Sequence, residues 1–431
     1  LGRTDCAQLL IAAKARIDVQ DECLMTPLIS AALKCHLECL RLLVAARANI
    51  GARDGDGDTA LHLAVLGGHT RCVRLLIAAK ASVNTRNNEQ CTALILAASE
   101  GNTVCVQLLV NAKADIHVGD NMRWTSFIWA ARYGHIECLR LLIKAAADVN
   151  APSFRGTTAL YLAAGNGHIE CLQLLVDANA NIEARDNDEM TALMSAASYG
   201  RSECIQLLVD LKADIHVVDD EDNTALIWAA RKSDTTDDDD AEDDEDASVL
   251  FPIAPNGYRD CLQILIDAKA HIEVTDDIHR TSLLWMARRG DSECLRVLMD
   301  AKASISARDN QGYTALAHAA ATGSTDCVRL LTDANADIEA KDIRVQAGPV
   351  APLFHAAAQG HVDLLRFLID SNANLETRDA EGLTPLIVAC EMELEQCVEL
   401  LIDAGADIEA VSRDGSTALM MAAKWHNSES M

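Results

Sequence analysis

The chain has 431 residues, of which 50% are hydrophobic and only 3% aromatic, and its formal net charge is −28. Nucleic acids and anionic membranes are themselves negative, so this charge argues against both as general partners and favours basic ones. No run of about 18 apolar residues is present, so we expect no transmembrane helix and no direct membrane insertion. Nothing like a signal peptide follows Leu1.

Residues 158–186 show the unit from which most of the chain is built. Leu160 and Ala163 are spaced as on one face of a short helix, and the segment 171–175 repeats that spacing for a second helix. Thr158 precedes the first helix, where its hydroxyl can cap a free amide. Helices of two to three turns are marginal alone in water. The unit must therefore gain its stability from neighbouring copies.

The Thr-x-Leu start of this unit recurs along the chain. Its spacing is 33 residues except between Thr224 and Thr281, which are 57 apart, and between Thr314 and Ala351, which are 37 apart. A fixed period in this range is typical of a solenoid. The starts are Thr26, Thr59, Thr92, Thr125, Thr158, Thr191, Thr224, Thr281, Thr314, Ala351 (where the Thr is lost), Thr384 and Thr417.

The sequence pattern of the repeats resembles the ankyrin repeat over nearly the whole chain. It includes T-P-L-x-x-A at Thr384, G-H-x-E at Gly167, and L-L-[IV] followed by A-x-A-[DN]-[IV]. The resemblance implies an all-α solenoid of antiparallel helix pairs joined by β-hairpin-like fingers. The sequence departs from the family at two points. The family's His after T-P-L is kept only at His62, and the Gly that closes the second helix survives only at Gly405.

We expect one continuous array over residues 1–431. It opens with a half repeat at residues 1–18 and closes with a half repeat from residue 417, so both ends fall in mid-repeat. Because solenoids need polar capping repeats at their ends, this pattern suggests a piece of a longer protein.

Eleven of the fifteen cysteines fall in one slot of the second helix. That slot lies on the apolar stripe, so we expect buried thiols that act as small hydrophobes, with neither metal nor disulfide. Free thiols in this number indicate a reducing, intracellular and cytoplasmic location. Cys23 and Cys91 fall in fingers, where either thiol has the chance of being exposed, and we expect both to be ordinary finger residues. The slot residues are Cys6, Cys39, Cys72, Cys105, Cys138, Cys171, Cys204, Cys261, Cys294, Cys327 and Cys397.

Two insertions interrupt the period. Residues 233–255, within the repeat that starts at Thr224, carry the acidic block DTTDDDDAEDDEDAS at 234–248, which predicts disorder. A tolerated surface loop, a grip for a basic partner and a mask over a basic patch of this chain all stay open as roles for it. Residues 341–350 lengthen one finger and predict a rearranged turn.

No catalytic motif or cofactor motif is present. His69, His135, His168 and His361 share the corner slot, where the family uses His for a structural hydrogen bond between loops. Aspartates five residues before the Thr, such as Asp120 and Asp309, have the spacing of finger turns in which the carboxylate binds backbone amides. We therefore expect no enzyme activity, no cofactor and no metal in these residues.

A binding surface is expected where the repeats differ, at the fingertips and at the residues four, seven and eight after each Thr. Large aromatic and basic side chains gather there in the middle repeats, in a chain that is otherwise acidic. Trp and Arg often dominate binding energy; the alternative is that the tryptophans pack between repeats and the arginines stay solvated. The candidates are Trp129, Arg132, Tyr133, Tyr199, Trp228, Arg231, Lys232, Trp285, Arg288 and Arg289.

We therefore predict a non-enzymatic protein–protein interaction scaffold that binds through the concave face and the fingers. An acidic segment of a partner would fit the basic and aromatic strip, and a basic segment would fit the 234–248 loop. The alternative is an architectural ankyrin segment, fixed inside a large assembly or the cytosolic part of a membrane protein. The oligomeric state does not follow from the sequence.

Overall fold

The computed structural model describes residues 4–231, 257–342 and 350–424. It contains 24 α-helices in these ranges, and its only strand pairing there consists of isolated bridges. The chain divides into two compact units, and each is described by itself. Unit 1 comprises residues 1–196 and 203–213, and unit 2 comprises residues 197–202 and 214–431.

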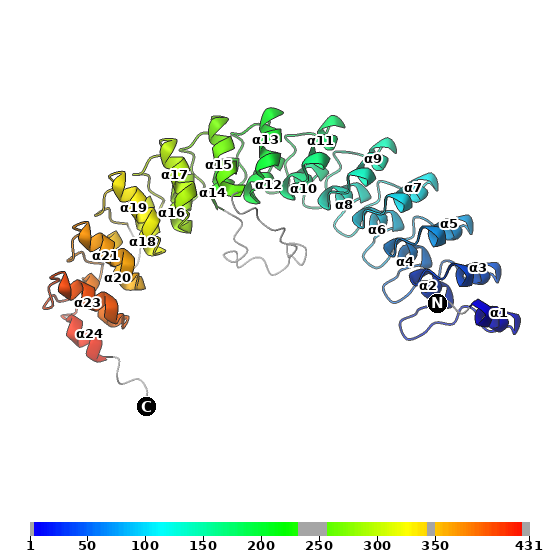
Figure 1. Cartoon of the computed structure of the whole chain (residues 1–431), viewed down its shortest axis with the longest axis horizontal. Helices are drawn as coiled ribbons and strands as arrows, with labels where there is room; N and C mark the ends of the chain where they lie inside the picture. Colours follow the sequence, from blue (N-terminus) through cyan, green and yellow to red (C-terminus); the bar gives the residue numbers. More distant parts are fainter. Residues whose placement is uncertain (1–3, 232–256, 343–349, 425–431) are drawn as a thin grey trace. The chain divides into compact units, whose positions relative to one another are not determined.

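Unit 1 is a stack of helix pairs in chain order. The first helices of successive pairs contact one another in one row, and the second helices form another row beside it (Figure 1). The first helices are α2 (Pro27–Leu33), α4 (Ala60–Leu66), α6 (Ala93–Ser99), α8 (Ser126–Arg132) and α10 (Ala159–Gly165). The second helices are α1 (Thr4–Ala12), α3 (Leu37–Ala45), α5 (Thr70–Ala78), α7 (Thr103–Asn111), α9 (Ile136–Lys144) and α11 (Ile169–Asp177). The pair α12 (Ala192–Ser198) and α13 (Ser202–Asp210) follows, where the two units meet in sequence.

Unit 2 repeats this arrangement with its own two rows. Its first helices are α14 (Ala225–Arg231), α16 (Ser282–Arg289), α18 (Ala315–Ala321), α20 (Pro352–Gln359), α22 (Pro385–Glu391) and α24 (Ala418–Lys424). Its second helices are α15 (Gly257–Asp267), α17 (Ser292–Asp300), α19 (Thr325–Asp333), α21 (Val362–Asp370) and α23 (Glu395–Asp403). The fold is thus the all-α ankyrin type of solenoid that the sequence predicts.

The threonines begin the first helices as predicted. Thr158 Oγ1 accepts a hydrogen bond from the Tyr161 amide at 3.3 Å, and the same cap recurs at most other starts. At Ala351 the hydroxyl is lost and the cap has no side-chain bond. Pro352 there occupies the first turn, where its missing N–H has no intrahelical partner to lose.

The cysteine slot is buried along most of the array, as the sequence predicts. From Cys72 onward every slot cysteine is buried, and all fifteen cysteines are free thiols. Two corrections apply at the start of the chain. Cys6 is exposed and Cys39 is half-buried. Both lie at the beginning of the row of second helices, where α1 has no buried residue. In its finger Cys91 is buried, and this burial raises the pKa of its thiol to about 12.

The corner histidines bind the preceding repeat, which confirms their expected structural role. The Nε2–H of His135 donates to the Ser99 carbonyl at 2.9 Å, and that of His168 donates to the Arg132 carbonyl at 2.9 Å. Tyr258 stands in the same slot after the long insertion, and its hydroxyl donates to the Ser198 carbonyl at 2.8 Å. The inter-repeat hydrogen bond is therefore kept across the insertion by a different side chain.

Eleven of the twelve described second helices end in the left-handed conformation without glycine; α23 is followed by Gly405, with φ of 88°. At the slot where the family has Gly, those eleven have Lys, Arg, Asn or Ala with φ between 61° and 72°. The Cβ of an L-residue is disfavoured there, so each such residue carries local strain. The residues are Lys14, Arg47, Lys80, Lys113, Ala146, Asn179, Lys212, Lys269, Lys302, Asn335 and Asn372.

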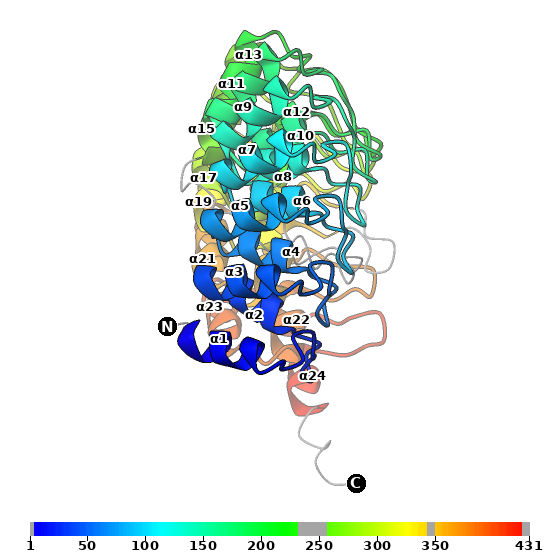
Figure 2. The same ribbon diagram turned by 90° about the vertical axis from the view of Figure 1, so that its right-hand side faces the viewer.

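The fingers of unit 1 project from one edge of its helix rows (Figure 2). As predicted, an aspartate five residues before the Thr organises most of the described turns; Asp120 Oδ1, for example, accepts from the amides of Met122 and Trp124 at 2.9 and 2.8 Å. Adjacent fingers are joined by backbone hydrogen bonds, such as Phe154 N to Met122 O at 2.8 Å. These bonds link the backbone of each finger to that of the next.

Candidate interaction surface

The predicted strip lies on the first helices and their C-terminal ends. Trp129 and Arg132 are on α8, Trp228 and Arg231 on α14, and Trp285 on α16. The other candidates follow these positions, with Tyr133 capping α8, Tyr199 after α12, and Arg288 and Arg289 closing α16. Lys232 and the acidic block 234–248 lie outside the described residues.

In unit 1, three aromatic rings surround one guanidinium group. The Cζ of Arg132 lies 4.7 Å from the ring centroid of Trp124, 5.5 Å from that of Trp129 and 5.7 Å from that of Tyr133. Trp129 stacks on Tyr133 with centroids 5.7 Å apart. Arg132 is only 7% exposed. We call these four residues the unit 1 aromatic cluster; the rings stay half-buried around a cation that is already enclosed.

Unit 2 places an arginine between two tryptophans. Arg231 Cζ lies 5.2 Å from the ring of Trp228 and 5.5 Å from that of Trp285, and its Nη1 forms an ion pair with Glu221 Oε2. Arg280 approaches Trp285 from the finger, with its Cζ 4.8 Å from the ring centroid. We call these four side chains (Trp228, Arg231, Arg280 and Trp285) the unit 2 aromatic cluster.

The remaining candidates differ in exposure. Arg289 donates to the Ala230 carbonyl at 2.9 Å and lies 5.0 Å above the ring of Tyr258, so it serves the packing of unit 2. Arg288 and Tyr199 are exposed. The alternative in which the arginines all stay solvated is therefore wrong for Arg132 and Arg289. The cation that the strip presents most openly among its described residues is Arg288.

A repeated hydrogen bond fixes the three tryptophans of the strip. The indole N–H of Trp129, Trp228 and Trp285 donates to the Oδ2 of Asp120, Asp219 and Asp276, at 2.8, 2.6 and 2.8 Å. Each aspartate lies nine residues earlier and uses its Oδ1 for the finger turn. One carboxylate thus shapes the finger and orients the ring, and we call this pair the Asp–indole anchor.

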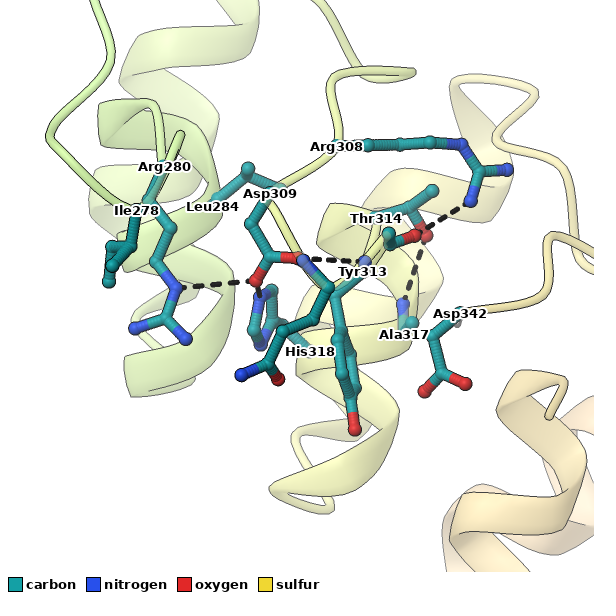
Figure 3. Close-up of polar contacts among 12 residues, drawn as sticks. Ile278, Arg280, Leu284, Arg308, Asp309, Tyr313, Thr314, Ala317, His318 and Asp342 are labelled. Atoms are coloured by element: carbon teal, nitrogen blue, oxygen red, sulfur yellow. Dashed lines mark hydrogen bonds and ion pairs between the residues drawn. The ribbon is translucent and has the colours of Figure 1, made fainter. Parts of the chain in front are cut away.

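Histidine takes the same place in the next two repeats, which the sequence analysis missed. His318 Nε2–H donates to Asp309 Oδ2 at 2.9 Å, and His355 Nε2–H donates to Asp342 Oδ2 at 2.7 Å. Figure 3 shows that Asp309 Oδ2 accepts from both His318 and Arg280, and the Arg280 Nε lies 3.3 Å from it. The sequence held a signal for these pairs. His318 and His355 stand four residues after the start of their repeats, in the slot that holds Trp in other repeats, and each follows a finger that contains an aspartate.

Burial dominates the electrostatics of these anchors. It raises the pKa of Asp219 and of Asp276 above the ordinary value, against the opposing hydrogen bonds from backbone and indole. Burial pushes the pKa of Asp309 upward too, but the bonds from His318 and Tyr313 bring it below the usual value. Burial lowers the pKa of His318 despite the nearby carboxylate, so its ring is neutral at pH 7. At pH 7 the anchor therefore pairs a neutral His318 ring, as donor, with an ionised Asp309 carboxylate, as acceptor.

The described residues hold no group of three or more His, Cys, Asp or Glu side chains arranged to bind a metal ion. Within the same residues, no helix has both the length and the apolar character needed to cross a bilayer.

The sequence matches the family described as Ankyrin repeats (3 copies) over residues 1–87, 80–153, 152–219, 250–342 and 353–431. The chain belongs to the ankyrin-repeat family. Proteins of this family are generally protein–protein interaction modules and typically non-enzymatic scaffolds. A search of curated proteins finds no match.

Proposed function

We propose that this chain is a non-enzymatic scaffold that binds a protein partner through the predicted strip on its first helices and through the fingers. The observation that carries the proposal is the Asp–indole anchor, which holds Trp129, Trp228 and Trp285 half-exposed in fixed orientations. A ring that is already ordered loses little conformational freedom on binding, so less of its contact energy is offset by the cost of ordering.

The partner segment that fits unit 2 is acidic, with apolar side chains beside the charge. Arg288 supplies an exposed cation on the same helix as Trp285. Arg231 already has Glu221 as a counter-ion and Arg132 is enclosed by rings, so these two contribute mainly by supporting the aromatic surface. A basic segment bound by residues 234–248 is the other pairing that charge favours.

The test is a quantitative pull-down from the cells that produce the chain, comparing wild type with Trp228→Ala/Trp285→Ala. We expect specific partners to be lost from the double variant. Because the indoles also support the fold, Arg288→Glu serves as a second variant, with the exposed Arg296 on α17 changed to Glu as its matched control. Loss with Arg288→Glu and retention with Arg296→Glu is the expected result.

Two outcomes would contradict the proposal. One is an unchanged set of partners in both the double variant and Arg288→Glu, while circular dichroism shows that each is folded. The other is stoichiometric co-purification with a large complex that neither variant disturbs, which would favour the architectural role.

A further inference from the structure

The row of second helices in unit 1 contains a groove to which the strip does not contribute. The groove has a volume of about 640 Å³, and the residues that line it come from α9, α11 and α13 and all belong to unit 1. The strip residues of that unit lie instead on the first helices and at their C-terminal ends. A ligand held in the groove would therefore occupy a second surface, distinct from the one in the proposed function.

Four aliphatic side chains line the groove, namely Ile136, Ile169, Leu174 and Leu207. Each is half-buried, so each still presents apolar surface to solvent. Ile136 and Ile169 stand two residues before the slot cysteine, and nowhere else do two successive repeats both have an aliphatic residue at this position. The groove is therefore apolar because two adjacent repeats depart from the usual pattern. Ser or Thr holds the position at Thr4, Thr70, Thr103, Ser202, Ser292 and Thr325.

The charged residues of the groove give it a negative balance. Among the described residues that line it, Glu137, Glu170 and Asp177 are acidic and Arg140 is basic. Arg140 Nε lies 3.3 Å from Glu137 Oε1, so this positive charge already has a counter-ion. The side-chain amide of Gln173 donates to Asp177 at 2.8 Å, which leaves the carboxylate charge in place. The groove thus combines apolar walls with two carboxylates beyond its one ion pair, and a segment with apolar and basic side chains complements both features.

Charge decides between the possible occupants of the groove. The chain has a net charge of −28, so a second copy would bring more negative charge to a rim that is already negative. The acidic block 234–248 of the same chain is disfavoured for the same reason. Nucleic acids and anionic membranes are repelled as well, because their phosphates are negative. The occupant that charge favours is a basic segment of another protein.

We propose that the groove formed by α9, α11 and α13 binds a short segment of a partner protein that carries apolar side chains next to Lys or Arg. The apolar side chains pack on Ile136 and Ile169, and the cationic groups pair with Glu170 and Asp177 at the rim. Removal of apolar surface from water supplies affinity, and the charges select the basic partner. Together with the acidic partner proposed for the strip, the chain would hold two segments of opposite charge on its two rows of helices.

The test selects ligands from a phage-displayed library of random dodecapeptides on the immobilised full chain. Soluble Ile136→Ser/Ile169→Ser chain is present as competitor, so that peptides which bind any other surface are removed. Because Ser already holds this position at Ser202 and Ser292, the double variant should fold, which circular dichroism checks. We expect the enriched peptides to combine apolar residues with Lys or Arg. Enrichment of acidic peptides, or no enrichment over the unselected library, would overturn the proposal.

Fluorescence anisotropy with an enriched peptide then separates the apolar and the charged contributions. Affinity should fall about tenfold or more in Ile136→Ser/Ile169→Ser, because two apolar contacts are lost. It should fall several-fold in Glu170→Lys, where an attraction becomes a repulsion. The matched controls are Val362→Ser on α21 and Asp326→Lys on α19, which stand at the equivalent positions of other repeats and should leave affinity unchanged. An equal loss in Glu170→Lys and Asp326→Lys would show that the peptide follows only the overall negative charge, and the proposed groove would then be wrong.

Discussion

Single residues in this chain carry strain that the ankyrin pattern ordinarily avoids. The slot after each second helix has positive φ whether it holds Lys, Asn or Ala. Lys favours the negative end of the helix dipole, and Asn tolerates the left-handed conformation, so both have a partial compensation. Ala146 has neither, which makes it the clearest place to measure the strain.

We predict that Ala146→Gly stabilises unit 1. Ala146 has φ of 66°, so removing its Cβ relieves a cost of about 1–2 kcal/mol, offset by about 0.5–1 kcal/mol of extra freedom in the unfolded chain. The expected gain is about 0.5–1 kcal/mol in the free energy of unfolding, measured by urea denaturation.

The neighbouring residue is the matched control for this change. Ala145 has φ of −83°, and Ala145→Gly should lower the free energy of unfolding by about 0.5–1 kcal/mol. A stabilising Ala145→Gly, or a destabilising Ala146→Gly, would show that the dihedral angle is not the controlling quantity.

Elements in this fold are held by side chains that reach from one repeat to the next. His62 begins this at α4: its Nδ1 accepts from the Thr59 amide at 3.0 Å, and its Nε2–H donates to the Thr85 carbonyl at 3.0 Å in the next finger. The bond from the Thr59 amide requires the neutral ring, because protonation of Nδ1 removes the acceptor, whereas Nε2–H can still donate. Burial lowers the pKa of His62 to about 4 from its ordinary 6.5.

Acid should therefore loosen this junction in a defined pH window. As the pH falls through 6.5 the unfolded chain takes up a proton at His62 and the folded chain does not, so stability present above 6.5 is lost down to about pH 4. The loss is on the order of 2–3 kcal/mol. It should appear as faster amide exchange in α4 and the 85–92 finger.

The pH dependence identifies the histidine responsible. His62→Gln should flatten the loss between pH 7 and 4.5, although it lowers stability at pH 7. His69→Gln, a change at the corner of the same repeat, should keep the loss. An equal pH dependence in wild type and His62→Gln would assign the effect to other groups.

The sequence predicted the elements better than the surface. Thr158 and its equivalents locate each helix start, and the cysteine slot identifies the buried face, because both depend on local spacing. The positions of Arg132 and Arg231 were not predictable, since they depend on rings outside their own helices: Trp124 in the preceding finger for Arg132, and Trp285 on α16 for Arg231. The exposure of Cys91 was likewise open from its finger position alone, and the structure buries it.

At the scale of the whole chain, stability comes from contacts between adjacent repeats. Within each row, helices contact their nearest neighbours in chain order inside each unit, and most core side chains are small or branched aliphatics. Stability in such an array is close to a sum of repeat and interface terms. Damage in one repeat should therefore stay local.

We predict that Leu94→Ala acts only near α6. Leu94 is 1% exposed, so its truncation should cost about 2–5 kcal/mol. Hydrogen exchange measured by mass spectrometry should accelerate in α4 to α8 and stay unchanged in α18 to α22. Leu353→Ala on α20 should give the converse pattern, with faster exchange in α18 to α22 and no change in α4 to α8. Uniform acceleration along the chain in either variant would instead show that the array unfolds as a single cooperative unit.

The Asp–indole anchor and the corner hydrogen bond differ in how they are inherited. The two partners of the anchor lie nine residues apart in one continuous stretch of a finger and the helix after it, so duplication of that stretch copies an oriented ring complete with its support. The corner bond spans two repeats and works only if a neighbour offers its carbonyl. An array can thus multiply oriented aromatic rings simply by lengthening, while the cohesion between its modules must be rebuilt at every new junction.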